Sequence, residues 1–169
     1  MAILQILHYP DPRLRDKAAH IENIDRALRR FIDDMLETMY DAPGVGLAAT
    51  QVGVARRIAV MDCSEKKNEP MVMINPQILW SEQPAVVDEG CLSVPEHYDQ
   101  VTRYKKVGMR AMDVHGERYE LHAEGLQAQC IQHEIGHLDG GLYIDLLSRL
   151  KQHRIRRKLE KTMKEKRKA

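Results

Sequence analysis

Two histidines in the segment QHEIGHL stand four residues apart, with a glutamate directly after the first. This spacing places the imidazoles of His133 and His137 on one face of a helix at adjacent turns, where both can bind one metal ion. Glu134 then lies beside the ion as a candidate general base. The alternative is a surface helix with two solvated histidines, but apolar neighbours favour burial of this helix. These neighbours are Leu126, Ala128, Cys130, Ile131 and Leu138.

A catalytic metal site usually takes three protein ligands and keeps one position open. A histidine six residues after His137 is excluded, because Tyr143 stands there, and the only glutamates beyond His137 lie in the basic tail. Cys130 would lie about 10.5 Å from His137 along the same helix axis, too far for one ion, and suits core packing better. Cys91 remains, either as a small buried residue of a strand or as the thiolate of a Cys-His-His site.

The elements that must position these residues follow from the hydrophobic pattern. Apolar residues recur at three- and four-residue steps over 25–40 and predict an amphipathic helix that ends at a Pro-Gly pair. Further helices are expected over 124–138 and from about 148 onward. Short apolar runs predict strands at 57–62, 71–76, 77–80, 91–95, 106–114 and 117–123, with a hairpin turn in VHGE. Residues 1–169 are therefore expected to form one α+β domain.

The composition is that of a globular protein without membrane spans or a disulfide scaffold. Of 169 residues, 43% are hydrophobic and 30% are charged, and no run approaches the length of a membrane helix. The three widely spaced cysteines and the absence of a signal-peptide pattern indicate a reducing cytoplasm. Residues 151–169 carry ten Lys and Arg against two Glu, whereas the rest of the chain is net negative, so the tail is expected to have a partner of its own.

Three segments, GVGLAATQ, EGCLS and QHEIGHL, resemble in order and spacing the signature motifs of the bacterial peptide deformylases, and the resemblance extends over nearly the whole chain. It implies removal of the N-terminal formyl group from formyl-methionine of nascent polypeptides, with release of formate. It implies antiparallel sheets packed around a central metal-binding helix, with helices toward both termini. It also implies one divalent metal ion per chain, Fe2+ in the cell and Zn2+ or Ni2+ in preparations.

The resemblance also implies roles for particular residues. Cys91, His133 and His137 would bind the metal, and Glu134 would move the proton of the attacking water. The side-chain amide of Gln51 and the backbone N–H of Leu92 would donate to the oxyanion of the intermediate. An extended peptide would pair with a glycine loop, and its methionine side chain needs an apolar pocket. Substrate contacts are expected from Val45, Gly46, Leu126 and Cys130, each of which could instead serve packing or loop formation alone.

Two positions depart from the family pattern. Gly136 stands directly before the second histidine, where the family usually has an acid, and Gln129 replaces a normally apolar residue. Glycine inside a helix costs roughly 1 kcal/mol relative to alanine, and loss of an acid near metal ligands weakens their support. We therefore expect an active deformylase with weaker activity or looser metal binding. An HExxH zinc endopeptidase and a weakened paralogue that binds ribosomes are the alternatives.

Residues 148–169 predict a cationic helix with a narrow apolar stripe formed by Ile155, Leu159 and Met163. A solvated terminal helix packed lightly on the body is one interpretation. The resemblance favours docking of this helix on the ribosome near the exit tunnel, where many cations would give salt-dependent binding to RNA.

Overall fold

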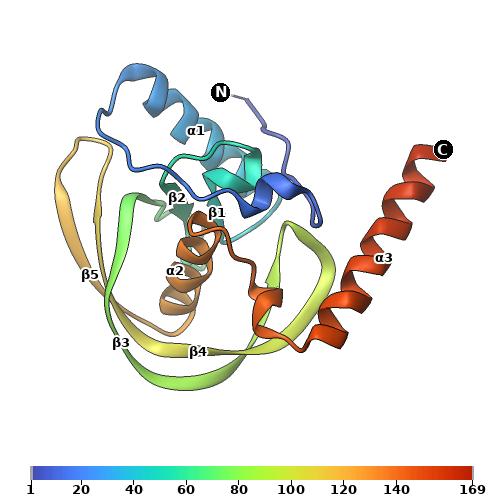
Figure 1. Cartoon of the computed structure of the whole chain (residues 1–169). Coiled ribbons are helices and arrows are strands. Elements are labelled where there is room, and N and C mark those ends of the chain that lie inside the picture. Colours follow the sequence, from blue (N-terminus) through green and yellow to red (C-terminus); the bar gives the residue numbers. More distant parts are fainter. Residues whose placement is uncertain (1, 169) are drawn as a thin grey trace.

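A strongly curved antiparallel sheet wraps around one helix in the computed structural model, which describes residues 2–168 (Figure 1). The helices are α1 (Arg26–Asp41), α2 (Gly125–Leu138) and α3 (Arg149–Lys168), with short 3-10 turns at Pro12–Arg15, Ala49–Val52 and Tyr143–Leu146. The strands are β1 (Gly46–Ala48), β2 (Ile58–Met61), β3 (Met71–Cys91), β4 (Val94–Met112) and β5 (Arg118–Glu124). The predicted α+β class and the three predicted helices are confirmed.

The sheet has the order β1-β2-β3-β4-β5, and every neighbouring pair is antiparallel. The prediction of several short strands between 71 and 114 was wrong, because β3 and β4 are long, bent strands paired with each other from Ile74↔Met112 to Cys91↔Val94. Pro76 and Pro84 do not interrupt β3, since β2 pairs with it only as far as Ile74. Among residues 2–168 no strand pairs with this edge of β3 beyond Ile74, and Pro76 lies in a register shift between Ile74 and Gln77. Open edges and bulges are where strands tolerate proline.

Helix α2 forms the centre of the core. Its buried side chains pack with buried side chains from all five strands (Figure 1). The members of this cluster are Ala48, Ala59, Met61, Met73, Val107, Met109, Ala111, Ala123, Ala128, Cys130, Ile131, Ile135 and Leu138. The small alanines on the strands let the helix approach the sheet closely, so the histidine face of α2 is held rigidly against the end of β3.

Helix α1 positions the loop that leads into β1. The helix begins at Asp25, whose side chain accepts a hydrogen bond from the backbone N–H of Leu28. Near its other end, the Tyr40 hydroxyl donates to the buried carboxylate of Asp62 at 2.5 Å, and the backbone N–H of Asp62 donates to the Val45 carbonyl at 2.8 Å. Burial alone would raise the pKa of Asp62, but hydrogen bonds from Ser64 and Tyr40 lower it to about 2. An ionised anchor therefore ties α1, β2 and the Val45 loop together.

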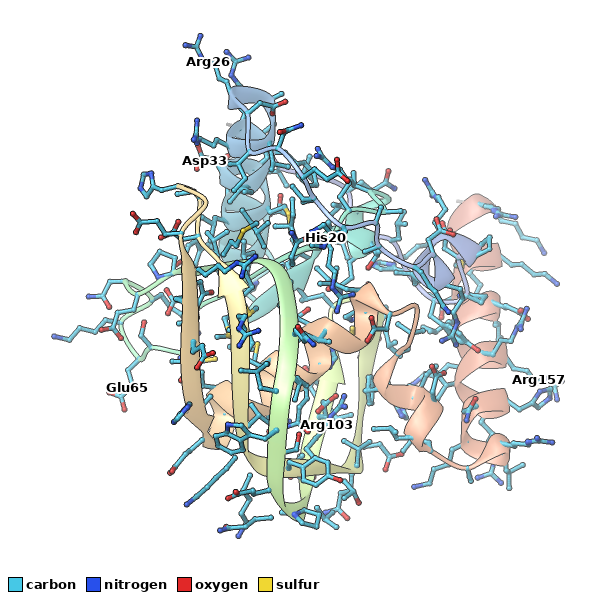
Figure 2. All side chains as sticks on the ribbon, turned by 60° about the vertical axis from the view of Figure 1, so that its left-hand side comes forward. His20, Arg26, Asp33, Glu65, Arg103 and Arg157 are labelled. Atoms are coloured by element: carbon cyan, nitrogen blue, oxygen red, sulfur yellow. The ribbon has the colours of Figure 1, made fainter. Side chains whose placement is uncertain are left out.

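Helix α3 contacts the body through a narrow face. Ile155 and Leu159 are buried in a second apolar cluster, and Met163 is half-buried, whereas most other α3 side chains are exposed. Figure 2 shows Arg26 on α1 at the top of the view and Arg157 on α3 at the right, so the two side chains project from different parts of the molecule. Over residues 2–168, no helix has the length and apolar character needed to cross a membrane.

Candidate metal centre

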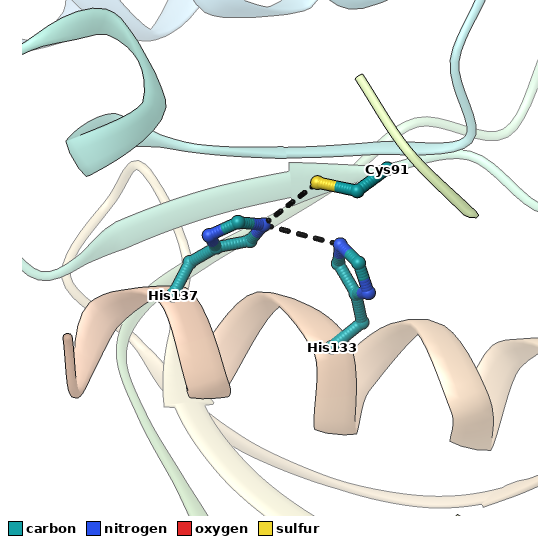
Figure 3. A group of neighbouring side chains, drawn as sticks. All are labelled: Cys91, His133 and His137. Atoms are coloured by element: carbon teal, nitrogen blue, oxygen red, sulfur yellow. Dashed lines mark hydrogen bonds between the residues drawn. The ribbon is translucent and has the colours of Figure 1, made fainter. Parts of the chain in front are cut away.

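Cys91, His133 and His137 meet between the end of β3 and the face of α2 (Figure 3). The Cys91 Sγ lies 3.2 Å from the His137 Nε2, which lies 3.1 Å from the His133 Nε2. All three potential ligand atoms lie within 4.8 Å of one another. A bulge at Gly90/Cys91 ends the regular pairing of β3 with β4, and the pairing resumes as Cys91↔Val94.

Glu89 fixes the orientation of His133. The His133 Nδ1 donates to the Glu89 carboxylate at 2.8 Å, and Arg103 holds the same carboxylate through two hydrogen bonds of 2.6 and 3.0 Å. Burial works against ionisation of Glu89, but its bonds to His133 and Arg103 lower its pKa to about 2. With Nδ1 protonated and bound to Glu89, the Nε2 lone pair of His133 faces the other two ligand atoms.

This donor set fits one divalent metal ion. A thiol sulfur and two imidazole nitrogens converge at separations that metal bonds of about 2.0–2.3 Å allow. The carboxylate behind His133 is the partner that metal-bound histidines usually have. A Cys-His-His set with borderline and soft donors suits zinc, iron or nickel better than calcium or magnesium.

Glu134 is buried beside this cluster, with 2% of its surface exposed. Burial is the main reason that its pKa is raised to about 7, although the neighbouring charge of His133 lowers it. Among the described residues, its Oε1 has no hydrogen-bond partner. A buried carboxyl group with such a pKa can both accept and return a proton near neutral pH.

The lack of a side chain at Gly46 makes room for the Glu134 carboxylate. A Cβ atom on Gly46 would lie 2.4 Å from the Glu134 Oε2 and 2.8 Å from the Cys130 Sγ. The Cys130 thiol donates weakly to the Glu134 Oε2 and to the Val45 carbonyl, at 3.8 Å in each case. Gly46 is therefore required by close packing around Glu134, and Cys130 lies beside that carboxylate but outside the cluster of potential ligands.

Gln51 lies on the opposite side of Cys91. Its side chain is 1% exposed, and its Oε1 accepts a hydrogen bond from the backbone N–H of Ala48 at 2.9 Å. Its Nε2 donates to the Ser93 Oγ at 3.0 Å and approaches the Cys91 Sγ at 3.7 Å. The amide is thus held with its donor end toward the cluster.

A cleft of about 660 Å³ opens onto this arrangement. The structure brings nine of the ten predicted site residues to its lining, and the tenth, His137, is buried behind them. The nine are Val45, Gly46, Gln51, Cys91, Leu92, Leu126, Cys130, His133 and Glu134. Leu126 is 51% exposed at the edge of the cleft. A molecule that enters this cleft can therefore reach Cys91, His133, Glu134 and Gln51 together.

The sequence did not single out Glu89, Arg103 or Ser93, all of which support the site. Glu89 could have been predicted as a neighbour of the site, because it lies two residues before Cys91 and residues two apart in a strand share one face. Arg103 could not have been predicted from a local pattern, since β4 brings it to Glu89 only through long-range strand pairing. Gln129, predicted as a departure, donates to the Asp88 carbonyl at 2.9 Å and to Glu89 at 3.3 Å. It therefore adds a polar contact to the carboxylate that holds His133.

Gly136 lies on α2 with open space where a side chain would start, because a Cβ there meets no atom within 4 Å. We predict that Gly136→Asp slows metal loss during dialysis against a chelator several-fold, since an acid near the ligands strengthens metal binding. Gly136→Ala is the matched control, because it stiffens the helix without adding a carboxylate. Equal retention in the wild type and both variants would refute the idea that the missing acid loosens the metal.

Comparisons with known proteins agree on one family. Residues 3–153 match the family model described as polypeptide deformylase. Peptide deformylases of Alkalilimnicola ehrlichii and Azotobacter vinelandii are 57% and 59% identical, over 98% and 95% of this chain and 93% and 96% of theirs. The crystal structure of a peptide deformylase from Legionella pneumophila superposes with a TM-score of 0.93 at 47% identity, covering 99% of both chains.

Proposed function

This chain belongs to the polypeptide deformylase family and removes the N-terminal formyl group from nascent polypeptides, and from that premise we propose which residues carry out the reaction. The chain binds a single metal ion. We assign its ligands as Cys91, His133 and His137, with Glu89 and Arg103 holding His133 in place. When bound, the ion lowers the pKa of a water molecule and polarises the formyl oxygen. The convergence of the three donor atoms beside Glu134 carries this proposal.

Ferrous iron is the metal that we propose for the cell, and we place the enzyme in the cytoplasm. A mixed sulfur and nitrogen donor set accepts several transition metals, and binding strength alone favours zinc over ferrous iron. Supply and redox conditions therefore decide which ion is bound. Zinc or nickel would replace iron when protein is purified in air.

Glu134 moves the proton in this scheme. Its buried carboxylate accepts the proton of the attacking water and later delivers it to the departing amine. Its pKa of about 7, raised by burial, suits both steps near neutral pH. Because Gly46 has no side chain, nothing displaces the Glu134 carboxylate from its position at the cleft.

The substrate peptide lies in the cleft as an added strand beside the Val45–Gly46 loop, with its methionine side chain toward Leu126 and Cys130. Cys91, His133 and Gln51 line the same cleft, so the end of the peptide would lie against them. Because a formyl group is one methyl smaller than an acetyl group, crowding beside these residues favours formyl peptides.

The direct test is formate release from a formyl-Met tripeptide by protein prepared without oxygen and loaded with ferrous iron. We expect rapid release of formate, at most slow release of acetate from the acetyl-Met analogue, and no cleavage of casein. Casein cleavage without formate release would favour the endopeptidase alternative, which the relatives' names do not support.

Gln51→Ala is predicted to slow formate release about 100-fold, because loss of one donor to a developing oxyanion typically costs on the order of 3 kcal/mol. We propose that the Nε2 of Gln51 and the backbone N–H of Leu92 supply these donors. Ser93→Ala is the matched control, since it removes the partner of the same Nε2 but leaves the amide in place. A fall of less than tenfold in Gln51→Ala would remove Gln51 from this role.

The basic face of α3 is proposed to dock on ribosomal RNA near the exit tunnel. Lys161 and Lys164 are exposed, so reversing both charges leaves the buried contacts of α3 unchanged. We predict that this double variant to glutamate loses co-sedimentation with ribosomes at low salt, because fewer phosphates are neutralised. The same reversal of Arg26 and Arg30, which are exposed on α1, should have little effect. Figure 2 shows Arg26 on a different part of the molecule from Arg157 of α3. Equal loss in both variants would argue against specific docking through α3.

A further inference from the structure

Helix α2 is fixed to β4 by one buried glutamine, Gln132, which is 8% exposed. Its Oε1 accepts a hydrogen bond from the backbone N–H of Tyr104 at 2.9 Å, and its Nε2 donates to the Tyr104 carbonyl at 2.8 Å. The same Nε2 donates to the Ala128 carbonyl, one turn earlier on α2, at 3.0 Å. Both donors of the amide are therefore used, and the side chain joins the helix to one residue of the strand.

The Gln132 amide takes the place of a neighbouring strand at the edge of β4. The pairing of β5 with β4 ends at Lys106↔Glu124, so Tyr104 lies two residues beyond the end of that ladder. A side-chain amide offers one acceptor and one donor side by side, as the backbone of a paired strand residue does. Gln132 therefore satisfies the backbone of Tyr104 where β5 no longer can.

The neighbours of these two residues are the groups that orient His133. Arg103 directly precedes Tyr104 in β4 and donates two hydrogen bonds to the Glu89 carboxylate, at 2.6 and 3.0 Å. That carboxylate accepts a hydrogen bond from the His133 Nδ1 at 2.8 Å. His133 in turn directly follows Gln132 in α2. The contacts thus form a closed ring between the helix and the strand.

We propose that Gln132 is a positioning residue for the metal centre, because it sets where β4 lies against α2 and so directs the Arg103 guanidinium at Glu89. This inference rests on the proposed ligation, in which His133 is a metal ligand. A bidentate pair of guanidinium and carboxylate requires both partners to be placed accurately. Without the Gln132 amide, β4 can shift near Tyr104, and the support of His133 weakens.

The expected consequence is faster loss of metal without a change in substrate binding. Gln132 is not among the residues that line the substrate cleft, so KM for formyl-Met peptides should not change. A residue that only stabilised the fold would not separate these two quantities. The separation therefore distinguishes a positioning role from general support of the protein.

The test measures how fast nickel-loaded enzyme loses its metal to an excess of chelator. Gln132→Met keeps the length of the side chain and removes both hydrogen-bonding groups. We expect it to lose nickel about five times faster than the wild type, below the roughly 10–100-fold effect of removing a direct partner of a ligand. KM for a formyl-Met tripeptide is measured on the same preparation.

A second substitution tests whether Gln132 acts through Arg103. Arg103→Lys keeps a positive charge beside Glu89 but removes the bidentate contact, so it should speed nickel loss by itself. Gln132→Met should add little in that background, because residues that act through one set of contacts are not additive. Tyr104→Ala is the matched control, since it removes a side chain that is 44% exposed and leaves the backbone groups that Gln132 binds. It should lose nickel at the rate of the wild type.

Equal rates of nickel loss in the wild type and Gln132→Met would overturn the proposal, as would a full additional effect of Gln132→Met in the Arg103→Lys background. Should Gln132→Met fold poorly, Gln132→Glu provides the same comparison. It keeps the acceptor for the Tyr104 N–H, removes the donor and should also lose nickel faster. Failure of the proposed ligation is distinguishable, because Arg103→Lys would then leave the rate of nickel loss unchanged as well.

Discussion

Glu134→Ala is expected to lower the rate of formate release by about a thousandfold or more while the protein keeps one metal ion per chain. General acid–base groups contribute about 10²–10⁴-fold, and the role proposed for this buried carboxylate is to accept the proton of the attacking water and deliver it to the departing amine. Its pKa of about 7, raised by burial, means that replacement by a smaller apolar side chain removes a group that exchanges protons readily near neutral pH. Formate release and metal content are measured on the same preparation.

Glu65→Ala is the matched control, since Glu65 is exposed in the loop between β2 and β3 and should leave both quantities unchanged. Glu134→Gln separates proton transfer from shape, because the amide fills the same volume without accepting a proton at neutral pH. Activity within tenfold of wild type in Glu134→Gln would contradict the assignment of Glu134 as the proton carrier. Loss of metal in Glu134→Ala would indicate instead that the residue supports the site.

Cys91→Ala is expected to abolish both metal retention and formate release. The thiol is one of the three proposed ligand atoms, and without it two imidazoles from the same helix would hold the ion from one side only. The loss should exceed the 10–100-fold effects that follow from removing a group behind a ligand, such as Glu89. Metal per chain is measured after gel filtration in buffer without added metal.

Cys63→Ala is the control for this change, because it removes another half-buried thiol that lies outside the three-residue cluster. It should keep its metal. A Cys91→Ala protein that retains one tightly bound ion per chain would show that the third ligand is a different group, and the assignment of Cys91 would have to be withdrawn.

Much of the candidate site could be predicted from short sequence patterns, because its key residues lie on one helix and one strand end. The i, i+4 spacing of His133 and His137 depends only on helix geometry, and α2 has the predicted extent to within one residue. The amphipathic pattern of α1 is equally local, and the predicted range 25–40 differs from the observed Arg26–Asp41 by one residue at each end. The resemblance, rather than spacing, supplied the roles of Gln51 and Leu92, which are still to be tested.

The sheet could not be predicted in the same way. Turn-forming residues between short apolar runs made β3 look like separate strands. In the structure, Asn75 and Gln83 within β3 have a positive φ. Its continuity depends on pairing with β4 across the whole hairpin, and no local pattern records that pairing. The same long-range pairing brings Arg103 to Glu89.

X-ray absorption at the iron edge of the ferrous enzyme tests the central claim most directly. The proposed ligation by Cys91, His133 and His137 predicts one sulfur and two imidazole nitrogens around the iron, in a preparation whose formate release is measured in parallel. Loss of the sulfur signal in Cys91→Ala would link that neighbour to this residue. An iron environment without sulfur, in enzyme that releases formate, would contradict the account.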